Sequence, residues 1–245
     1  MPTPIFLLLF RPHGDSDVER LVDDARVAVL RDTAIYAQMA GFEHVVIGTS
    51  APDRFTDLSG IEIDCDNVDG DPMGFAARFN SMISNFRPSS LCYMGSGMPL
   101  INENVLSEIR IRLEKSEHPF ALTNNLYSSD LLATNALDSL IDLPAHTTDN
   151  SLALRLRDQD GLTVDVLSRS AETLLDIDTP TDLQILTLLN RTQRNGTRLG
   201  QEFGQWLTDA AIDTTRLEIA IDYFTRRNTE ALVTGRISAD VWRCL

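Results

Sequence analysis

The sequence has very little lysine, few cysteines and no long hydrophobic run. Of its 21 basic residues only Lys115 is a lysine, so a mechanism that needs an amine on a phosphate has one candidate. The three cysteines lack a closely paired spacing and the four histidines are scattered, which excludes the usual zinc-ligand patterns. The apolar run Ile5–Phe10 is too short for a membrane span or a signal peptide. We therefore expect a cytoplasmic protein without a membrane partner.

The charge of the chain is strongly acidic. Asp and Glu number 36 against 21 Lys and Arg, which gives a net charge of −15 at pH 7. This excludes a protein that binds nucleic acid through its phosphate backbone, because such proteins need a basic surface. A single nucleotide is not excluded, because a few local donors can hold its phosphates. The hydrophobic share of 43% indicates a folded globular chain.

Apolar runs and helical periodicities alternate over residues 1–190. Short apolar segments predict strands at 5–10, 44–48, 61–64, 91–94, 120–123 and 162–167, with a strand-like run at 173–175. Helical spacing predicts helices at 18–39, 74–86, 104–115, 151–157 and 181–191. The alternation is typical of a three-layer, Rossmann-like α/β domain with a mainly parallel sheet. Ligands bind outside the carboxyl ends of the strands in such sheets, so we expect the site there.

Residues 191–245 are predicted to form a helical extension of the 1–190 domain. Apolar residues fall on one face of 197–212, and Asp213 or Thr214 caps a further helix. Ser238 has the features of another N-cap, only seven residues before Leu245. This ending predicts a chain cut from a longer protein. We expect the extension to mediate self-association or to contact a further domain.

The most specific string in the sequence is Asp176–Leu183, which reads DIDTPTDL. Pro180 suits a first helical turn, and Asp182 suits the positive end of the helix dipole. Asp176 and Asp178 stand two apart in an extended segment, so both can face one pocket and hold Mg²⁺. The alternative is a capped helix start with solvated aspartates.

This string resembles the D-[IVL]-[DN]-T-P-E-D-L ending of the GT-A-like nucleotidyltransferases. That superfamily includes the molybdenum-cofactor guanylyltransferases and the guanylyltransferases that activate 2-phospholactate or phosphoenolpyruvate. Weaker similarities to these families follow in the same order along the chain, at Gly70–Gly74, Leu122–Leu126, Asp149–Arg155, Gly161–Val164, Ser170 and Leu174. The resemblance covers residues 1–190 and implies a GT-A nucleotidyltransferase fold.

The resemblance also implies roles for particular residues. Arg11 and Asp178 are expected to be catalytic, Arg11 on phosphates and Asp178 with Asp176 as Mg²⁺ ligands. Small residues at turns are expected to approach the nucleotide: Gly70, Pro72, Gly74, Gly95 and Gly97. Three residues at the end of a strand are expected to face the acceptor: Thr123, Asn124 and Asn125.

Two positions depart from the pattern of these families. Their first loop is rich in Gly, Arg and Lys, whereas Arg11–Asp17 has no lysine, one glycine and two acids. Gly97 stands where the families place a metal-binding Asp. Nucleotidyl transfer depends on positioning and on neutralising charge, so both changes weaken the case for catalysis.

Three functions remain open. The first is a nucleotidyltransferase that moves a nucleotide from an NTP, such as GTP, to a small phosphorylated or acidic acceptor. The second is a degenerate relative that binds a nucleotide or a partner as a regulatory or scaffold module. The third is a GT-A glycosyltransferase that uses a nucleotide sugar; it ranks last because Met94–Leu100 contains no Asp-x-Asp.

Overall fold

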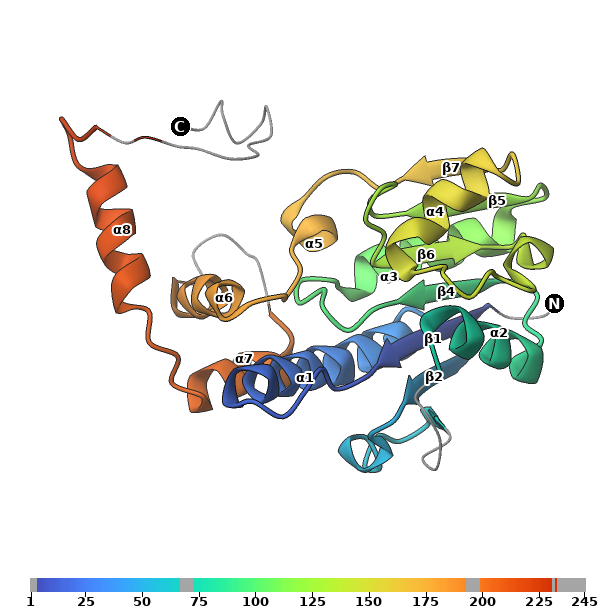
Figure 1. Ribbon diagram of the computed structural model, residues 1–245, viewed down its shortest axis with the longest axis horizontal. Helices are drawn as coiled ribbons and strands as arrows, with labels where there is room; N and C mark the ends of the chain where they lie inside the picture. The colour runs from blue at the N-terminus through green and yellow to red at the C-terminus, as the bar shows by residue number, and fades with distance from the viewer. Residues whose placement is uncertain (1–3, 67–72, 193–198, 231, 233–245) are drawn as a thin grey trace.

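A seven-stranded sheet forms the centre of the protein (Figure 1). The computed structural model describes residues 4–66, 73–192, 199–230 and 232. Across the sheet the strand order is β3-β2-β1-β4-β6-β5-β7. The strands are β1 (Ile5–Phe10), β2 (His44–Thr49), β3 (Glu62–Cys65), β4 (Leu91–Met94), β5 (Phe120–Thr123), β6 (Leu131–Thr134) and β7 (Thr163–Val166).

The sheet is mainly parallel, as the sequence predicts. β1 pairs in parallel with β2, where Ile5 lies opposite His44, and with β4, where Leu8 lies opposite Met94. The exception is β6, which runs antiparallel to both β4 and β5 and has no counterpart among the predicted strands. The carboxyl ends of β1, β2 and β4 therefore meet at one edge.

Helices cover both faces of the sheet (Figure 1). The buried run of β1 alternates, with Phe6 and Leu8 packed on one face and Ile5 and Leu7 on the other. The first face is covered by α1 (Asp17–Met39) and α3 (Glu103–Lys115), and the second by α2 (Phe75–Phe86) and α4 (Asp149–Asp158). This is the expected three-layer α/β arrangement.

One predicted strand is a helix. Residues 173–175 were expected to be extended, but Ala171–Leu174 form the short helix α5. The reason is a capping box, because the side chains of Ser170 and Thr173 each accept a hydrogen bond from the other's backbone N–H. The chain is extended only from Leu175, and it enters α6 (Pro180–Thr192) through the Asp176–Thr179 segment.

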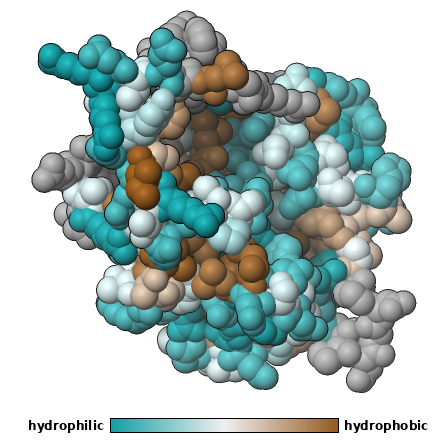
Figure 2. All heavy atoms as spheres, turned by 60° about the vertical axis from the view of Figure 1, so that its left-hand side comes forward, coloured by the Kyte–Doolittle hydropathy of each residue, from teal (hydrophilic) through white to brown (hydrophobic). Residues whose placement is uncertain are grey.

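The two described helices of the extension differ in packing. In α7 (Gln201–Asp209), Phe203 and Leu207 are buried in a cluster that also contains Val22 of α1. In α8 (Thr215–Thr225) no residue is buried, and the helix projects from the body of the molecule (Figure 1). Apolar side chains are exposed on this side of the molecule (Figure 2), those of α8 being Ile219, Ile221, Tyr223 and Phe224. No helix among the described residues is long and apolar enough to cross a membrane.

Candidate functional site

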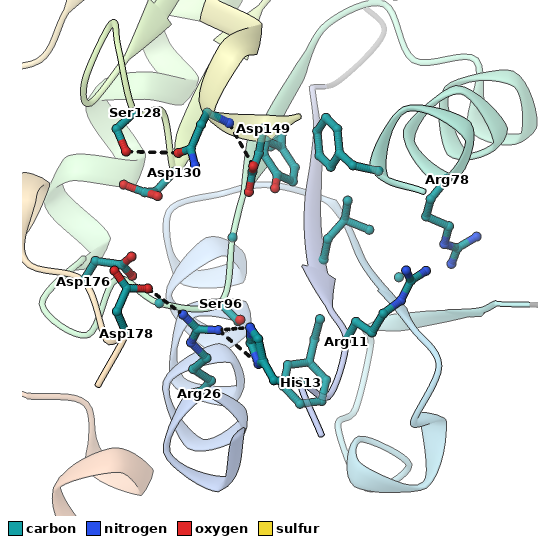
Figure 3. A pocket seen from close by; sticks show the side chains of 18 of the residues that line it. Arg11, His13, Arg26, Arg78, Ser96, Ser128, Asp130, Asp149, Asp176 and Asp178 are labelled. Atoms are coloured by element: carbon teal, nitrogen blue, oxygen red, sulfur yellow. Dashed lines mark hydrogen bonds and ion pairs between the residues drawn. The ribbon is translucent and has the colours of Figure 1, made fainter. Parts of the chain in front are cut away.

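A cavity of about 360 Å³ opens at the carboxyl ends of β1, β2 and β4. It lies at the sheet edge where an α/β fold is expected to bind its ligand. In Figure 3, Asp130, Asp176 and Asp178 lie on one side of this pocket and Arg11 and Arg78 on the other, with His13 and Arg26 between them. The pocket therefore has a carboxylate wall and a guanidinium wall.

The carboxylate wall contains Asp130, Asp149, Asp176 and Asp178. Burial raises the pKa of Asp176 to about 6, and the negative charges of Asp130 and Asp178 add to the effect. Burial also raises the pKa of Asp130, although a hydrogen bond from Asn124 opposes the change. These carboxyl groups therefore face one another in the pocket without full compensation of charge.

Gly97 lies directly against Asp176. A Cβ atom at position 97 would overlap the carboxylate of Asp176, so only glycine leaves the space that this carboxylate fills. The two segments are also joined through the backbone, because Ile177 N donates to Gly97 O at 2.9 Å and to Asp176 Oδ1 at 3.0 Å. The side chain expected at position 97 from the resembling families has no room in this arrangement.

Arg26, in the middle of α1, is a pocket residue that the sequence analysis missed. Its Nη2 donates to Asp178 Oδ1 at 3.1 Å and its Nε donates to Ile177 O at 2.8 Å. Its Nη1 lies 2.6 Å from His13 Nε2. No motif marks this arginine, since a single basic residue on a predicted helix is usually solvated. Its one signal is its place beside the apolar stripe of α1, which points toward the sheet.

The guanidinium wall is built around Asp66. Arg11 Nη2 donates to Asp66 Oδ2 at 3.1 Å and to Met73 O at 2.6 Å. Arg78, on the first turn of α2, is buried and forms ion pairs with Asp64 at 2.9 Å and with Asp66. The carboxylate of Asp66 thus holds two guanidinium groups close together, which is an arrangement suited to phosphate oxygens.

Five of the predicted site residues line the pocket: Arg11, Gly95, Gly97, Asp176 and Asp178. Gly74 caps α2, and its neighbours Met73 and Phe75 line the pocket while Gly74 itself does not. Gly70 and Pro72 lie outside the described residues. Lys115 ends α3 near the amino end of β5, at the opposite edge of the sheet.

None of the predicted acceptor residues lines the pocket. Thr123 is buried, and its hydroxyl donates to Leu131 O at 2.8 Å. Asn124 is buried too; its Oδ1 accepts from Asp130 N at 3.0 Å and its Nδ2 donates to Asp130 Oδ2 at 3.1 Å. Asn125 Oδ1 accepts from Tyr127 N. Asn124 therefore acts on the pocket indirectly, by holding Asp130 in place.

The two residues expected to hold Mg²⁺ are both engaged by other groups of the chain. Asp178 is bound by the guanidinium of Arg26, and Asp176 is turned against Gly97. Among the residues that the structure describes, no group of three or more His, Cys, Asp or Glu side chains is placed to hold a metal. A divalent cation at these two carboxylates would need water or the phosphates of a ligand to complete its oxygen ligands.

Comparison with solved structures identifies the fold. A putative nucleotide-diphospho-sugar transferase from Desulfovibrio desulfuricans G20 matches with a TM-score of 0.62 and 13% identity, over 86% of this chain and 97% of the other. A cytidylyltransferase from Leptospira borgpetersenii matches with a TM-score of 0.57 and 15% identity, over 95% of this chain and 100% of the other.

A nucleotidyl transferase from Methanothermobacter thermautotroptrophicus matches with a TM-score of 0.56 and 14% identity, over 78% of this chain and 98% of the other. The sequence matches no protein-family model, and no relative is found among the curated proteins. Identities this low show the fold alone. The chain has the Rossmann-like α/β fold of the GT-A-like nucleotidyltransferases.

Proposed function

We propose that the protein binds a nucleoside triphosphate in this pocket and transfers its nucleotidyl group to a small acceptor. The observation that carries the proposal is the division of the pocket into a guanidinium wall and a carboxylate wall at the edge where this fold binds ligands. The shared fold with nucleotidyltransferases supports the same reaction class.

The guanidinium wall is assigned to the phosphates. Arg11 and Arg78 hold the β- and γ-phosphates and stabilise the charge that develops on the leaving pyrophosphate. Asp66 and Asp64 keep both side chains in place before the ligand arrives. The resulting preorganisation lowers the cost of binding a multiply charged group.

The carboxylate wall is assigned to the acceptor. The acceptor oxygen forms a bond to the α-phosphorus, the bond between that phosphorus and the bridging oxygen breaks, and pyrophosphate leaves. Asp130 takes the proton from the acceptor, because it lines the pocket and Asn124 fixes its backbone and its carboxylate. The sequence predicts an acidic acceptor, but the four carboxyl groups on this wall favour an uncharged acceptor with a hydroxyl group, because they repel a second acid.

Binding and transfer are tested separately. Titration with CTP, GTP, UTP and ATP is expected to raise the melting temperature with at least one of them. Asp130→Asn is expected to keep that binding and to lose pyrophosphate release in the presence of small hydroxyl compounds. Asp165→Asn, an exposed acid on β7, is the matched control and is expected to change neither. Failure of every nucleotide to bind would contradict the proposal.

A second candidate is a nucleotide-binding relative without transferase activity. The occupied space at Gly97 and the contact of Arg26 with Asp178 favour it, because both differ from what the resembling families imply. Nucleotide binding without pyrophosphate release from any acceptor would support this candidate. Hydrolysis of, or transfer from, a nucleotide sugar would instead point to the glycosyltransferase alternative.

A further inference from the structure

Arg26 places its guanidinium directly against the Asp176–Asp178 segment, in contact with Ile177 O and Asp178. It extends from the middle of α1, and its side chain is only 12% exposed. Its guanidinium contacts one carbonyl, one carboxylate and one imidazole, so all three of its nitrogen atoms have a partner. Asp178 is 70% exposed, so it is the contacts with Ile177 O and His13 that hold the guanidinium in place beside it.

His13 and Asp23 fix the direction of Arg26. Asp23 is buried; its Oδ1 lies 2.6 Å from His13 Nδ1, and its Oδ2 accepts from His13 N at 2.8 Å. A carboxylate partner at Nδ1 assigns the ring proton to that atom, which leaves Nε2 as an acceptor for Arg26. The first loop and α1 thus position one guanidinium toward the pocket.

A divalent ion at Asp178 conflicts with this arrangement. The ion would lie within a few ångströms of a guanidinium that Ile177 O and His13 keep in place, and like charges at that distance repel. Asp176 is poorly placed as a second ligand, because one of its oxygens already accepts from Ile177 N and the carboxylate is packed on Gly97. Position 97 itself supplies no side chain.

We propose that Arg26 takes the place of a divalent metal in this pocket. Its guanidinium is the counter-charge of Asp178 and a direct contact for the phosphates of the ligand, so nucleotide binding is independent of divalent cations. The nucleotide part of this inference rests on the proposed function. The counter-charge part rests only on the contacts of Arg26, His13 and Asp178.

The counter-charge is tested with Mn²⁺ alone, by titration followed through its electron paramagnetic resonance signal. Wild-type protein is expected to bind Mn²⁺ weakly, and Arg26→Met is expected to bind it about tenfold more tightly or better, because Asp178 loses its counter-charge. Arg26→Met combined with Asp178→Asn should lose that gain. Tight Mn²⁺ binding by the wild-type protein that Asp178→Asn abolishes would overturn the proposal.

The nucleotide part is tested by calorimetric titration of CTP and GTP in EDTA and in excess Mg²⁺. The two dissociation constants are expected to agree closely for wild-type protein. Arg26→Met should weaken binding in EDTA by about tenfold or more, as expected for one charge-assisted hydrogen bond. Arg26→Lys should recover part of the loss, because it restores the charge without the planar group.

Arg20→Met on the same helix is the matched control, since Arg20 is exposed and pairs with Asp17 away from the pocket. It is expected to match the wild type in both titrations, and melting temperatures show that each variant is folded. Nucleotide binding that requires Mg²⁺ would overturn this inference and leave the proposed function standing. Binding of no nucleotide under either condition would overturn the proposed function, and the Mn²⁺ titration would still decide the role of Arg26.

Discussion

Helix α1 serves two regions that use charge in opposite ways. Toward α7, Arg31 pairs with Asp57 at 2.5 Å and with Glu202 at 2.5 Å, and Asp32 accepts hydrogen bonds from two backbone N–H groups of α7. Toward the pocket, several carboxyl groups face one another with fewer opposite charges. The first region engages each of these groups in contacts within the chain, although burial raises the pKa of Asp32, and such contacts favour a fixed structure. The second keeps charge uncompensated, which favours a ligand.

Among single substitutions in the two regions, we expect the largest loss of stability in the hydrophobic cluster between α1 and α7. Phe203 is fully buried in the cluster that contains Ile177, so it supports the Asp176–Asp178 segment as well as α7. Phe203→Ala is expected to lower the free energy of unfolding by about 3–5 kcal/mol, because it leaves a cavity. Urea denaturation measures the loss. A loss below about 1 kcal/mol would show that α7 does not pack on α1 in solution.

Asp32 is the next test of the α7 region. Its carboxylate accepts from Glu202 N at 3.1 Å and from Phe203 N at 2.9 Å, as an N-cap would. Asp32→Ala leaves these donors without their partner and is expected to cost about 1–3 kcal/mol in unfolding free energy. Asp32→Asn keeps one acceptor oxygen and should cost less. Equal losses in the two variants would mean that packing, not hydrogen bonding, explains the effect.

Asp57 and Asp176, one from each region, should respond to pH with opposite sign. Hydrogen bonds from Arg31 lower the pKa of Asp57 from 3.8 to about 2, so Asp57 stabilises the fold above pH 4 and this contribution is lost as pH falls toward 2. The pKa of Asp176 is raised from 3.8 to about 6, so this carboxyl group keeps its proton to a higher pH in the folded state than in the unfolded state. Stability is therefore lost as pH rises from about 4 to about 6.

Urea denaturation across this pH range separates the two effects. Asp57→Asn should be less stable than the wild type above pH 4, with the difference disappearing near pH 2. Asp176→Asn should be more stable than the wild type above pH 6, with the difference disappearing near pH 4. A destabilising effect of Asp176→Asn at neutral pH would contradict the view that its wall carries unrelieved repulsion.

The sequence predicts the core strands of the fold well because their signals are local. Ile5–Phe10 is a continuous apolar run, and such runs belong to strands buried on both faces. β6 (Leu131–Thr134) is a buried four-residue strand like the predicted β4, so its length does not explain why it was missed. Residues 173 and 174 were misassigned because the capping box of Ser170 and Thr173 starts a helix that outweighs the apolar run.

The candidate site was predictable only where a motif marks it. Asp176 and Asp178 stand in the DIDTP string, and both line the pocket. Arg26 and Arg78 sit on helices and reach the pocket through contacts 151 and 14 residues away in sequence, with Ile177 and Asp64. Such pairings depend on how the elements pack, so a single sequence carries no local sign of them.

The smallest effect on stability is expected in α8, which belongs to neither the α7 region nor the pocket. Phe224 is 57% exposed and α8 has no buried residue, so Phe224→Ser removes little packing. We expect a change in unfolding free energy within about 0.5 kcal/mol, in contrast to Phe203→Ala on the neighbouring helix. Urea denaturation of both variants at several protein concentrations provides the measurement. A loss above about 1 kcal/mol that grows with protein concentration would mean that a second copy of the chain covers α8. The contrast between an exposed α8 and a packed α7 would then apply only to the monomer.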